Sequence, residues 1–129
     1  MSMTADLRDL LKDAGVAGGR VYRDLRPAIA GLPAVTLQTI SEPINPLMKG
    51  EDALRETRVQ VNCYADSRQG ADDLRDAVLA ARPTRSVSGG TNFRRITAEG
   101  GRSGSDTADA GLITYWTMID LMIWHRPAS

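Results

Sequence analysis

The stretch TRVQVNCYADSRQGADDLRDAVLAAR, residues 57–82, contains the change of hydrophobic period that decides the fold. Its first nine residues alternate between apolar and polar side chains, and this period of two predicts a half-buried strand. One face of that strand carries Val59, Val61, Cys63 and Ala65, and the other carries Arg58, Gln60, Asn62 and Tyr64. We therefore expect the first face to lie against a hydrophobic core.

From Asp66 onward the apolar residues recur every three or four positions, at Ala71, Leu74, Val78 and Ala81. This spacing predicts a helix with one apolar stripe. Asp66 followed by Gln69 is a variant of the capping box, so we expect the helix to begin there. Pro83 disfavours a helical residue before it, so the helix should end at Arg82. The strand and the helix can then cover each other's apolar sides.

The N-terminal part predicts one more helix and two strands. A helix should begin at Thr4 and end at Gly15, with an apolar stripe that includes Leu7 and Leu11. Strands are expected over residues 20–25 and 34–42. Residues 43–52 contain two prolines and a glycine and predict a loop. Its apolar residues Ile44, Leu47 and Met48 either tuck under that loop or contact a partner.

The C-terminal part predicts a hairpin. Residues 83–90 are expected to form a loop, and residues 92–99 a strand anchored by Phe93 and Ile96. Residues 100–111 contain four glycines and few apolar side chains, which predicts a loop that is mobile in the free protein. Its charges, Arg102 against Asp106 and Asp109, would set its register against a neighbouring protein. The alternative is a slack hairpin that the fold tolerates.

The last expected strand, residues 112–125, is apolar on both faces. The core face would carry Ile113, Tyr115, Thr117, Ile119, Leu121 and Ile123, and the second face Leu112, Thr114, Trp116, Met118, Asp120, Met122 and Trp124. A strand of an antiparallel sheet with helices on one side should have a polar second face. Either this strand is covered on both sides within one chain, or another subunit buries its second face.

Composition limits the class of protein. At 129 residues the chain predicts a single domain, residues 1–129, with a core of its own. Sixteen basic residues balance sixteen acidic ones, which argues against a dedicated nucleic-acid or membrane-surface protein. One cysteine allows no internal disulfide. No signal peptide is visible, and no apolar run reaches the roughly 18 residues that a membrane span needs.

The residues that carry chemistry are few. His125 is the single histidine and is expected at the surface, and the sequence does not suggest the positioned neighbour that a catalytic base needs. Cys63 is expected to be a small buried side chain. No Cys/His grouping has the spacing of metal ligands, so we predict no catalytic residue, cofactor or metal site. Arg94 and Arg95 beside Phe93 suit a sheet edge or protein interface, or alternatively a nucleic acid.

The order of these elements resembles a known family. The chain begins with a helix, strands and a Pro/Gly loop. It continues with the segment Arg-Val-Gln-Val-Asn-Cys-Tyr-Ala at 58–65 and the helix with Ala-Asp-Asp-Leu-Arg-Asp-Ala-Val at 71–78, and it ends with a strand rich in Trp and Met. Leu-Pro-Ala-Val-Thr-Leu at 32–37 also fits. The chain is similar to the small tail-terminator, or tail-completion, proteins of long-tailed phages and of gene transfer agents, over nearly its whole length.

The resemblance implies a structural protein and no enzyme. It implies a homo-oligomeric ring, typically a hexamer, that stops growth of the tail tube and docks the tail on the head connector. The partners would be the tail tube protein and the connector, with DNA passing through the ring without sequence-specific binding and no membrane involved. The location would be the head–tail junction of a virion or phage-like particle, after assembly in the bacterial cytoplasm.

The sequence thus predicts an α+β fold, with an antiparallel sheet of four to five strands and two helices packed on one face. Alternatives to the ring are another head–tail connector component, or a small nucleic-acid-binding module that uses Arg94, Arg95 and Arg102. The candidate interface residues are Leu47, Met48, Arg94, Arg95, Arg102, Asp106, Asp109, Trp116, Met118, Met122 and Trp124.

Overall fold

The computed structural model describes residues 3–24, 31–41, 54–83, 85–107 and 113–127. Along the chain it contains α1 (Met3–Asp13), a short 3-10 turn η1 (Val16–Gly19), β1 (Val21–Arg23), β2 (Ala34–Ser41), β3 (Arg55–Ala65), α2 (Arg68–Ala81), β4 (Ser86–Ser88), β5 (Thr91–Thr107) and β6 (Ile113–Pro127). Both predicted helices are therefore confirmed. The predicted loop at 43–52, with Ile44, Leu47 and Met48, lies outside the described residues, as do Asp109 and Leu112.

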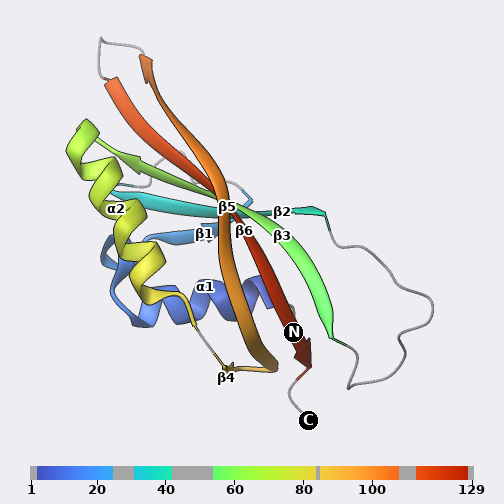
Figure 1. Cartoon of the computed structure of the whole chain (residues 1–129). Coiled ribbons are helices and arrows are strands. Elements are labelled where there is room, and N and C mark those ends of the chain that lie inside the picture. Colours follow the sequence, from blue (N-terminus) through green and yellow to red (C-terminus); the bar gives the residue numbers. More distant parts are fainter. Residues whose placement is uncertain (1–2, 25–30, 42–53, 84, 108–112, 128–129) are drawn as a thin grey trace.

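The strands form one mixed sheet in the order β1-β2-β3-β6-β5-β4, curled into a half-barrel (Figure 1). β1 runs parallel to β2, and every other neighbouring pair is antiparallel. The expected antiparallel sheet of four to five strands is therefore wrong in strand number and in direction. The strand expected at residues 20–25 is confirmed as β1, but a hydrophobic period does not show whether it runs parallel to β2, and the strand that was not expected is the three-residue β4.

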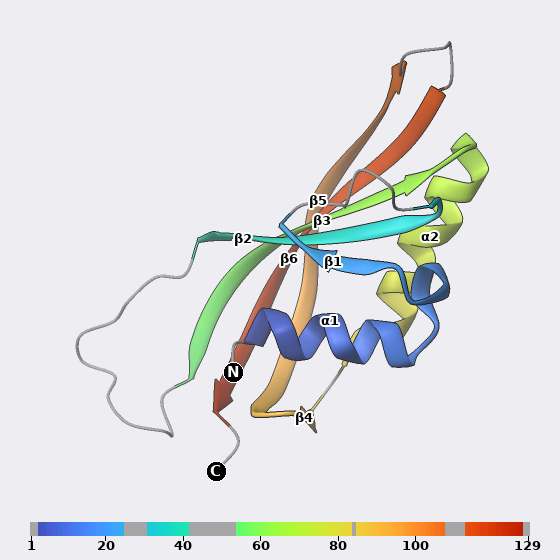
Figure 2. The same ribbon diagram turned by 180° about the vertical axis from the view of Figure 1, so that it is seen from behind.

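Both helices lie on one face of the sheet, as predicted (Figures 1 and 2). The apolar stripes of α1 and α2 meet the inward residues of β3 and β6 in a single core. That core includes Leu7, Leu11, Val59, Val61, Cys63, Leu74, Val78, Ile119, Leu121 and Ile123. The alternation in residues 57–65 therefore assigned the buried face of β3 correctly.

The start of α2 differs from the prediction by one position. Ser67 is the N-cap, in an extended conformation, and its side-chain oxygen accepts a hydrogen bond from the backbone N–H of Gly70 at 3.0 Å. Asp66 is exposed, and Gln69 donates to Asp73 at 2.7 Å instead of reaching back. Serine and aspartate cap equally well, so the sequence could not discriminate between the adjacent positions.

The predicted loop over residues 100–111 is wrong for residues 100–107. β5 continues through them and pairs with β6 from Thr91↔Pro127 to Thr107↔Ile113. The register shifts between Phe93 and Arg95 and between Ala98 and Gly100, so the strand contains two bulges. The expected loop at 83–90 likewise contains β4, which pairs with residues 91–93 of β5. Residues 100–107 are thus part of the sheet.

Two further features concern the helices and acidic residues. Within the described residues, neither helix is long and apolar enough to cross a membrane. The same part of the chain contains no group of three His, Cys, Asp or Glu side chains arranged to hold a metal ion. Asp72, Asp73 and Asp76 on α2 form hydrogen bonds with neighbouring side chains of α2 and β6.

Candidate interaction face of the sheet

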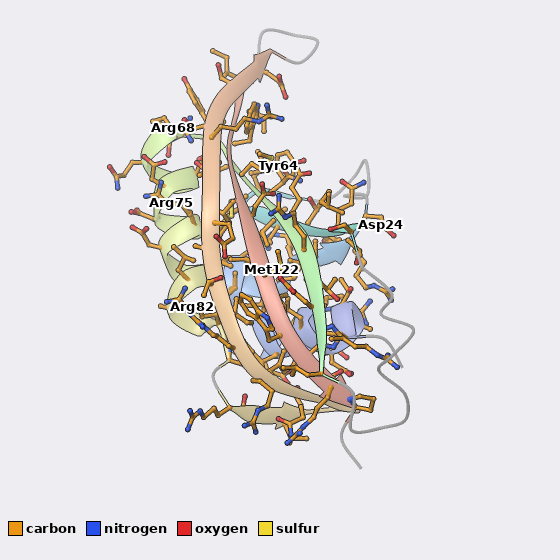
Figure 3. The ribbon with its side chains drawn as sticks, turned by 45° about the vertical axis from the view of Figure 1, so that its right-hand side comes forward. Asp24, Tyr64, Arg68, Arg75, Arg82 and Met122 are labelled. Carbon is orange, nitrogen blue, oxygen red and sulfur yellow. The ribbon has the colours of Figure 1, made fainter. Side chains whose placement is uncertain are left out.

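The sheet face that turns away from the helices is the candidate site, and we call it the open face. Adjacent strands align its side chains in rows, such as Tyr64 opposite Trp116 and Arg58 opposite Met122. Figure 3 shows Tyr64 and Met122 over the strands, whereas Arg75 and Arg82 lie along α2. The open face comprises Arg58, Gln60, Asn62 and Tyr64 of β3, Arg95, Thr97, Arg102 and Asp106 of β5, and Trp116, Met118, Asp120, Met122 and Trp124 of β6.

The apolar residues of the open face are shielded mainly by their neighbours in the sheet. Trp116, Met122 and Trp124 are half-buried, while Met118 is 9% exposed. Gln60 Nε2 donates to Met118 Sδ and, at 3.4 Å, to Asn62 Oδ1. Since both helices lie on the opposite face, these residues are not covered by a second layer in the described part of the chain. A strip of Trp and Met side chains therefore faces outward.

Two glycines of β5 lie so close to β6 that a side chain would not fit at either position. A Cβ atom on Gly104 would lie 2.5 Å from Cζ2 of Trp116, so the indole occupies the space that a side chain would need. A Cβ on Gly101 would overlap the backbone oxygen of Met118. Glycine therefore permits the close approach of β5 and β6, and residues 100–107 are strand despite their low apolar content.

Arg68 on α2 binds the β5–β6 hairpin near Gly104 and Trp116. Its guanidinium donates to the backbone oxygens of Gly104 at 3.2 Å and of Trp116 at 2.9 Å. It also donates to Thr117 Oγ1 at 2.5 Å and lies 6.0 Å from the centre of the Tyr115 ring. The first residue of α2 thus holds both strands of the β5–β6 hairpin beneath Trp116.

The predicted basic residues separate into different environments. Arg95 stacks on Trp124, with its guanidinium carbon 5.3 Å from the ring centre. Arg94 is exposed at the bulge between Phe93 and Arg95. Arg102 lies opposite Met118, further along β5. The three arginines are therefore not gathered at one point, although Arg95 and Arg102 share the open face.

Two shallow hollows lie on the open face. The larger, about 400 Å³, is bordered by Arg58, Arg102 and Asp120 together with Met118 and the exposed Ile40 of β2. The smaller, about 180 Å³, lies between Tyr64, Trp116 and Asp106. Among the described residues no ion pair involves Arg58, Arg102 or Asp120. These charged groups are consequently available to a partner that covers the face.

Cys63 and His125 carry the thiol and the imidazole, the side chains of this chain best suited to catalysis. Both lie on the core side of the sheet and not on the open face. Cys63 has none of its surface exposed, and burial raises the pKa of its thiol from 9.0 to about 12, against a smaller opposing effect of Arg75. The expectation of a surface position for His125 is wrong: its side chain is 4% exposed, and its Nε2 lies 2.8 Å from Thr57 Oγ1. His125 lies on the core face because β6 continues to alternate beyond Ile123, the last apolar residue on that face.

The structure brings most of the sequence candidates together. Arg95, Arg102, Asp106, Trp116, Met118, Met122 and Trp124 share the open face, Arg94 lies at its edge, and Leu47, Met48 and Asp109 are outside the described residues. Sequence reasoning did not select Arg58, Tyr64 and Asp120. The alternation of the two strands could have identified them, because all three residues alternate with core residues of β3 or β6 and so lie on the face opposite the core.

A search of curated proteins found no match to this chain. Among solved structures, the fold is similar to that of a chain in the structure described as "Virion of native gene transfer agent (GTA) particle". The TM-score is 0.58 at 16% identity, and the alignment covers 99% of this chain and 96% of that chain. The sequence profile of the family described as tail completion protein gp17 matches residues 4–126, nearly the whole chain, and the chain therefore belongs to this family of tail completion proteins.

Proposed function

We propose that this tail completion protein forms a ring, a hexamer, that caps the tail tube and joins the tail to the head connector. A structural role in a phage-type tail follows from the family. The observation that carries the finer proposal is the open face, because it presents Trp116, Met122 and Trp124 without a covering layer in the described structure (Figures 1 and 2). Trp and Met are enriched in the cores of protein interfaces.

Ring closure needs two different surfaces on each subunit, since a ring is built from heterologous contacts. The open face supplies one surface, and the edge of β5 supplies another. β4 pairs with β5 only at Thr91–Phe93, so Arg94–Thr107 pairs along one side, with β6, within the described structure. An unpaired strand edge presents backbone donors and acceptors that an extended segment of a neighbour can bind.

The location we propose is the head–tail junction of a virion or phage-like particle, after assembly in the bacterial cytoplasm. The similarity of the fold to a chain of a gene transfer agent virion supports this location. The tail tube protein and the head connector would be the partners. DNA would pass through the ring without sequence-specific binding, which agrees with a net charge of zero and with the dispersed Arg94, Arg95 and Arg102.

The test is removal of the gene in cells that produce the particle, followed by complementation. Without the protein we expect tails of uncontrolled length that are not attached to filled heads, and complementation should restore complete particles. Particles of normal tail length and normal infectivity or gene transfer in its absence would contradict the proposal. Tails of normal length that still lack heads would assign the protein to another position in the neck, the alternative that the sequence left open.

A further inference from the structure

A further, polar hollow of about 450 Å³ lies apart from the two on the open face, where the helix-side core ends. Arg23 at the end of β1, Arg55 at the start of β3 and Arg126 near the end of β6 line it. Arg55 is paired with His125 in the sheet register, which places the ends of β3 and β6 side by side at this point. Three strands distant in sequence thus bring arginines to the border of one hollow.

The charged side chains among the described residues that line this hollow are all basic. None of the described residues that line it is acidic, and no ion pair involves Arg23, Arg55 or Arg126 in that part of the chain. Asp6 lies behind the wall, 1% exposed, and its Oδ2 accepts a hydrogen bond from Thr91 Oγ1 at 2.6 Å. One carboxylate behind the wall does not balance the three arginines that border the hollow, so the described residues give it a positive potential.

The inner wall is polar and well ordered by its own contacts. His125 and Thr57 are 4% and 1% exposed, and they are joined by the 2.8 Å hydrogen bond between Nε2 and Oγ1. Thr4 and Thr39 are joined likewise at 3.1 Å, and Thr91 is fixed by Asp6. Buried hydroxyl and imidazole groups at the end of an aliphatic core suit a polar ligand better than an apolar one.

The geometry points to an oxyanion site whose ligand is the carboxylate of an acidic side chain from a protein partner. Guanidinium groups bind carboxylates through paired, charge-assisted hydrogen bonds, and the Thr4–Thr39 pair leaves one O–H free to donate to the same oxygens. Met3 and Pro127 add apolar wall that suits the methylene stem of such a side chain. A phosphate in a DNA backbone is a poorer fit, because the hollow accepts an inserted group and the chain has no basic excess.

The test uses the single histidine as a reporter. In the full chain without a histidine tag, the imidazole signal of His125 in NMR spectra comes from the wall of the hollow. We expect glutarate, added at constant ionic strength against sodium chloride, to shift this signal saturably. Arg55→Gln and Arg126→Gln should each weaken binding about tenfold, as loss of a charge-assisted hydrogen bond predicts. Arg94→Gln, which removes an exposed arginine outside the hollow, should leave binding unchanged.

Thermal melting of each variant checks that the fold is retained before binding is compared. A glutarate effect that does not saturate, or that is equal in the Arg55, Arg126 and Arg94 variants, would overturn the site, because it would reflect general screening. Saturable binding of inorganic phosphate without binding of glutarate would overturn the carboxylate assignment and favour a phosphate ligand. These outcomes do not depend on ring formation, so the site can fail or hold independently of the proposed function.

Discussion

Val61 lies on the helix side of β3 with none of its surface exposed, and a charge placed there tests the assignment of the faces. Val61→Asp should unfold the protein, because an unpaired buried carboxylate costs several kcal/mol, roughly the whole stability of a small domain. Asn62→Asp is the matched control, one residue along on the open face. Circular dichroism during heating measures both. A Val61→Asp protein that melts like the wild type would show that the faces are assigned wrongly.

Cys63 makes stability depend on pH in the alkaline range. Burial raises the pKa of its thiol from 9.0 to about 12, so the unfolded chain loses the proton first as pH rises. Its contribution to stability is full below pH 9.0 and is lost progressively toward pH 12. Above pH 9.0 the free energy of unfolding should fall with a limiting slope of about 1.4 kcal/mol per pH unit from this group.

Urea unfolding at a series of alkaline pH values measures this effect, with Cys63→Ala as the control. We expect the wild type to lose stability more steeply than Cys63→Ala, because the other titrating groups are common to both proteins. Parallel slopes would show that the thiol titrates alike in the folded and unfolded chain. Because slopes are compared, the small cavity left by alanine does not affect the result.

At the scale of elements, the glycines of β5 decide the structure of the hairpin. A Cβ on Gly101 would overlap the backbone oxygen of Met118, and backbone cannot move aside as a flexible side chain can. Gly101→Ala should therefore destabilise the protein by about 1–3 kcal/mol. Gly31→Ala, where the nearest neighbouring atoms lie 4.0 Å away in the Arg20 side chain, should change stability by less than about 0.5 kcal/mol.

Chemical denaturation of the two alanine variants provides the measurement. Equal stability of both would contradict the close pairing of β5 with β6 at Met118. It would instead support the loop that the composition of residues 100–111 suggests. The same result would make a mobile segment at residues 100–107 tenable again.

Local patterns predicted the elements whose side chains carry a clear period. The alternation at 57–65 and the stripes of Leu7/Leu11 and Leu74/Val78 placed α1, α2 and β3 correctly, because burial imposes those periods directly. Residues 100–107 were missed because backbone pairing and the neighbouring Trp116, rather than their own side chains, hold them in the sheet. β1 lies within the strand expected at residues 20–25, whereas β4 was missed because its three residues are too few to carry a period.

The candidate site was predictable in part for the same reason. The apolar second face of the last strand pointed to Trp116, Met118, Met122 and Trp124, and the sheet confirms that they share one face. Asp120 has the same alternation as these residues, whereas Arg58 joins the face through the pairing of β3 with β6, which a single sequence does not reveal. The hollow around His125 was missed because it is assembled from the ends of β1, β3 and β6.

Substitutions on the open face test its proposed role as an interface. Trp116→Ala and Trp124→Ala should shift the assembly toward monomers while the fold survives, since large interface side chains contribute about 2 kcal/mol or more. Met118→Ala should also cost monomer stability, because Met118 is already only 9% exposed in the single chain. Ile113→Ala, which removes an apolar side chain that is 44% exposed on β6 and alternates with the open-face residues, is the control.

Light scattering after gel filtration gives the mass of each variant, and thermal melting gives its stability. The interface is supported if the assemblies of the Trp variants lose mass while the proteins melt close to the wild type. If they melt early and keep the wild-type mass, the two indoles stabilise the sheet within one chain instead. That result would favour the other possibility raised by the sequence, a strand covered within the monomer.

At the scale of the whole molecule, the protein combines a helix-covered core, an open face rich in Trp and Met, and a long strand edge on β5. A chain of 129 residues with such surfaces should associate with itself, because a ring buries each subunit's open face and strand edge against its neighbours. The mass of one chain is 13.9 kDa, so every added copy is resolved by native mass spectrometry.

Native mass spectrometry of the purified full chain, with electron-microscopic images of the same sample, tests the ring most directly. We predict a closed assembly of six copies of the 13.9 kDa chain, seen as rings with a central opening wide enough for duplex DNA. A mass of 13.9 kDa at every protein concentration, also in the presence of tail tube ends, would contradict the ring.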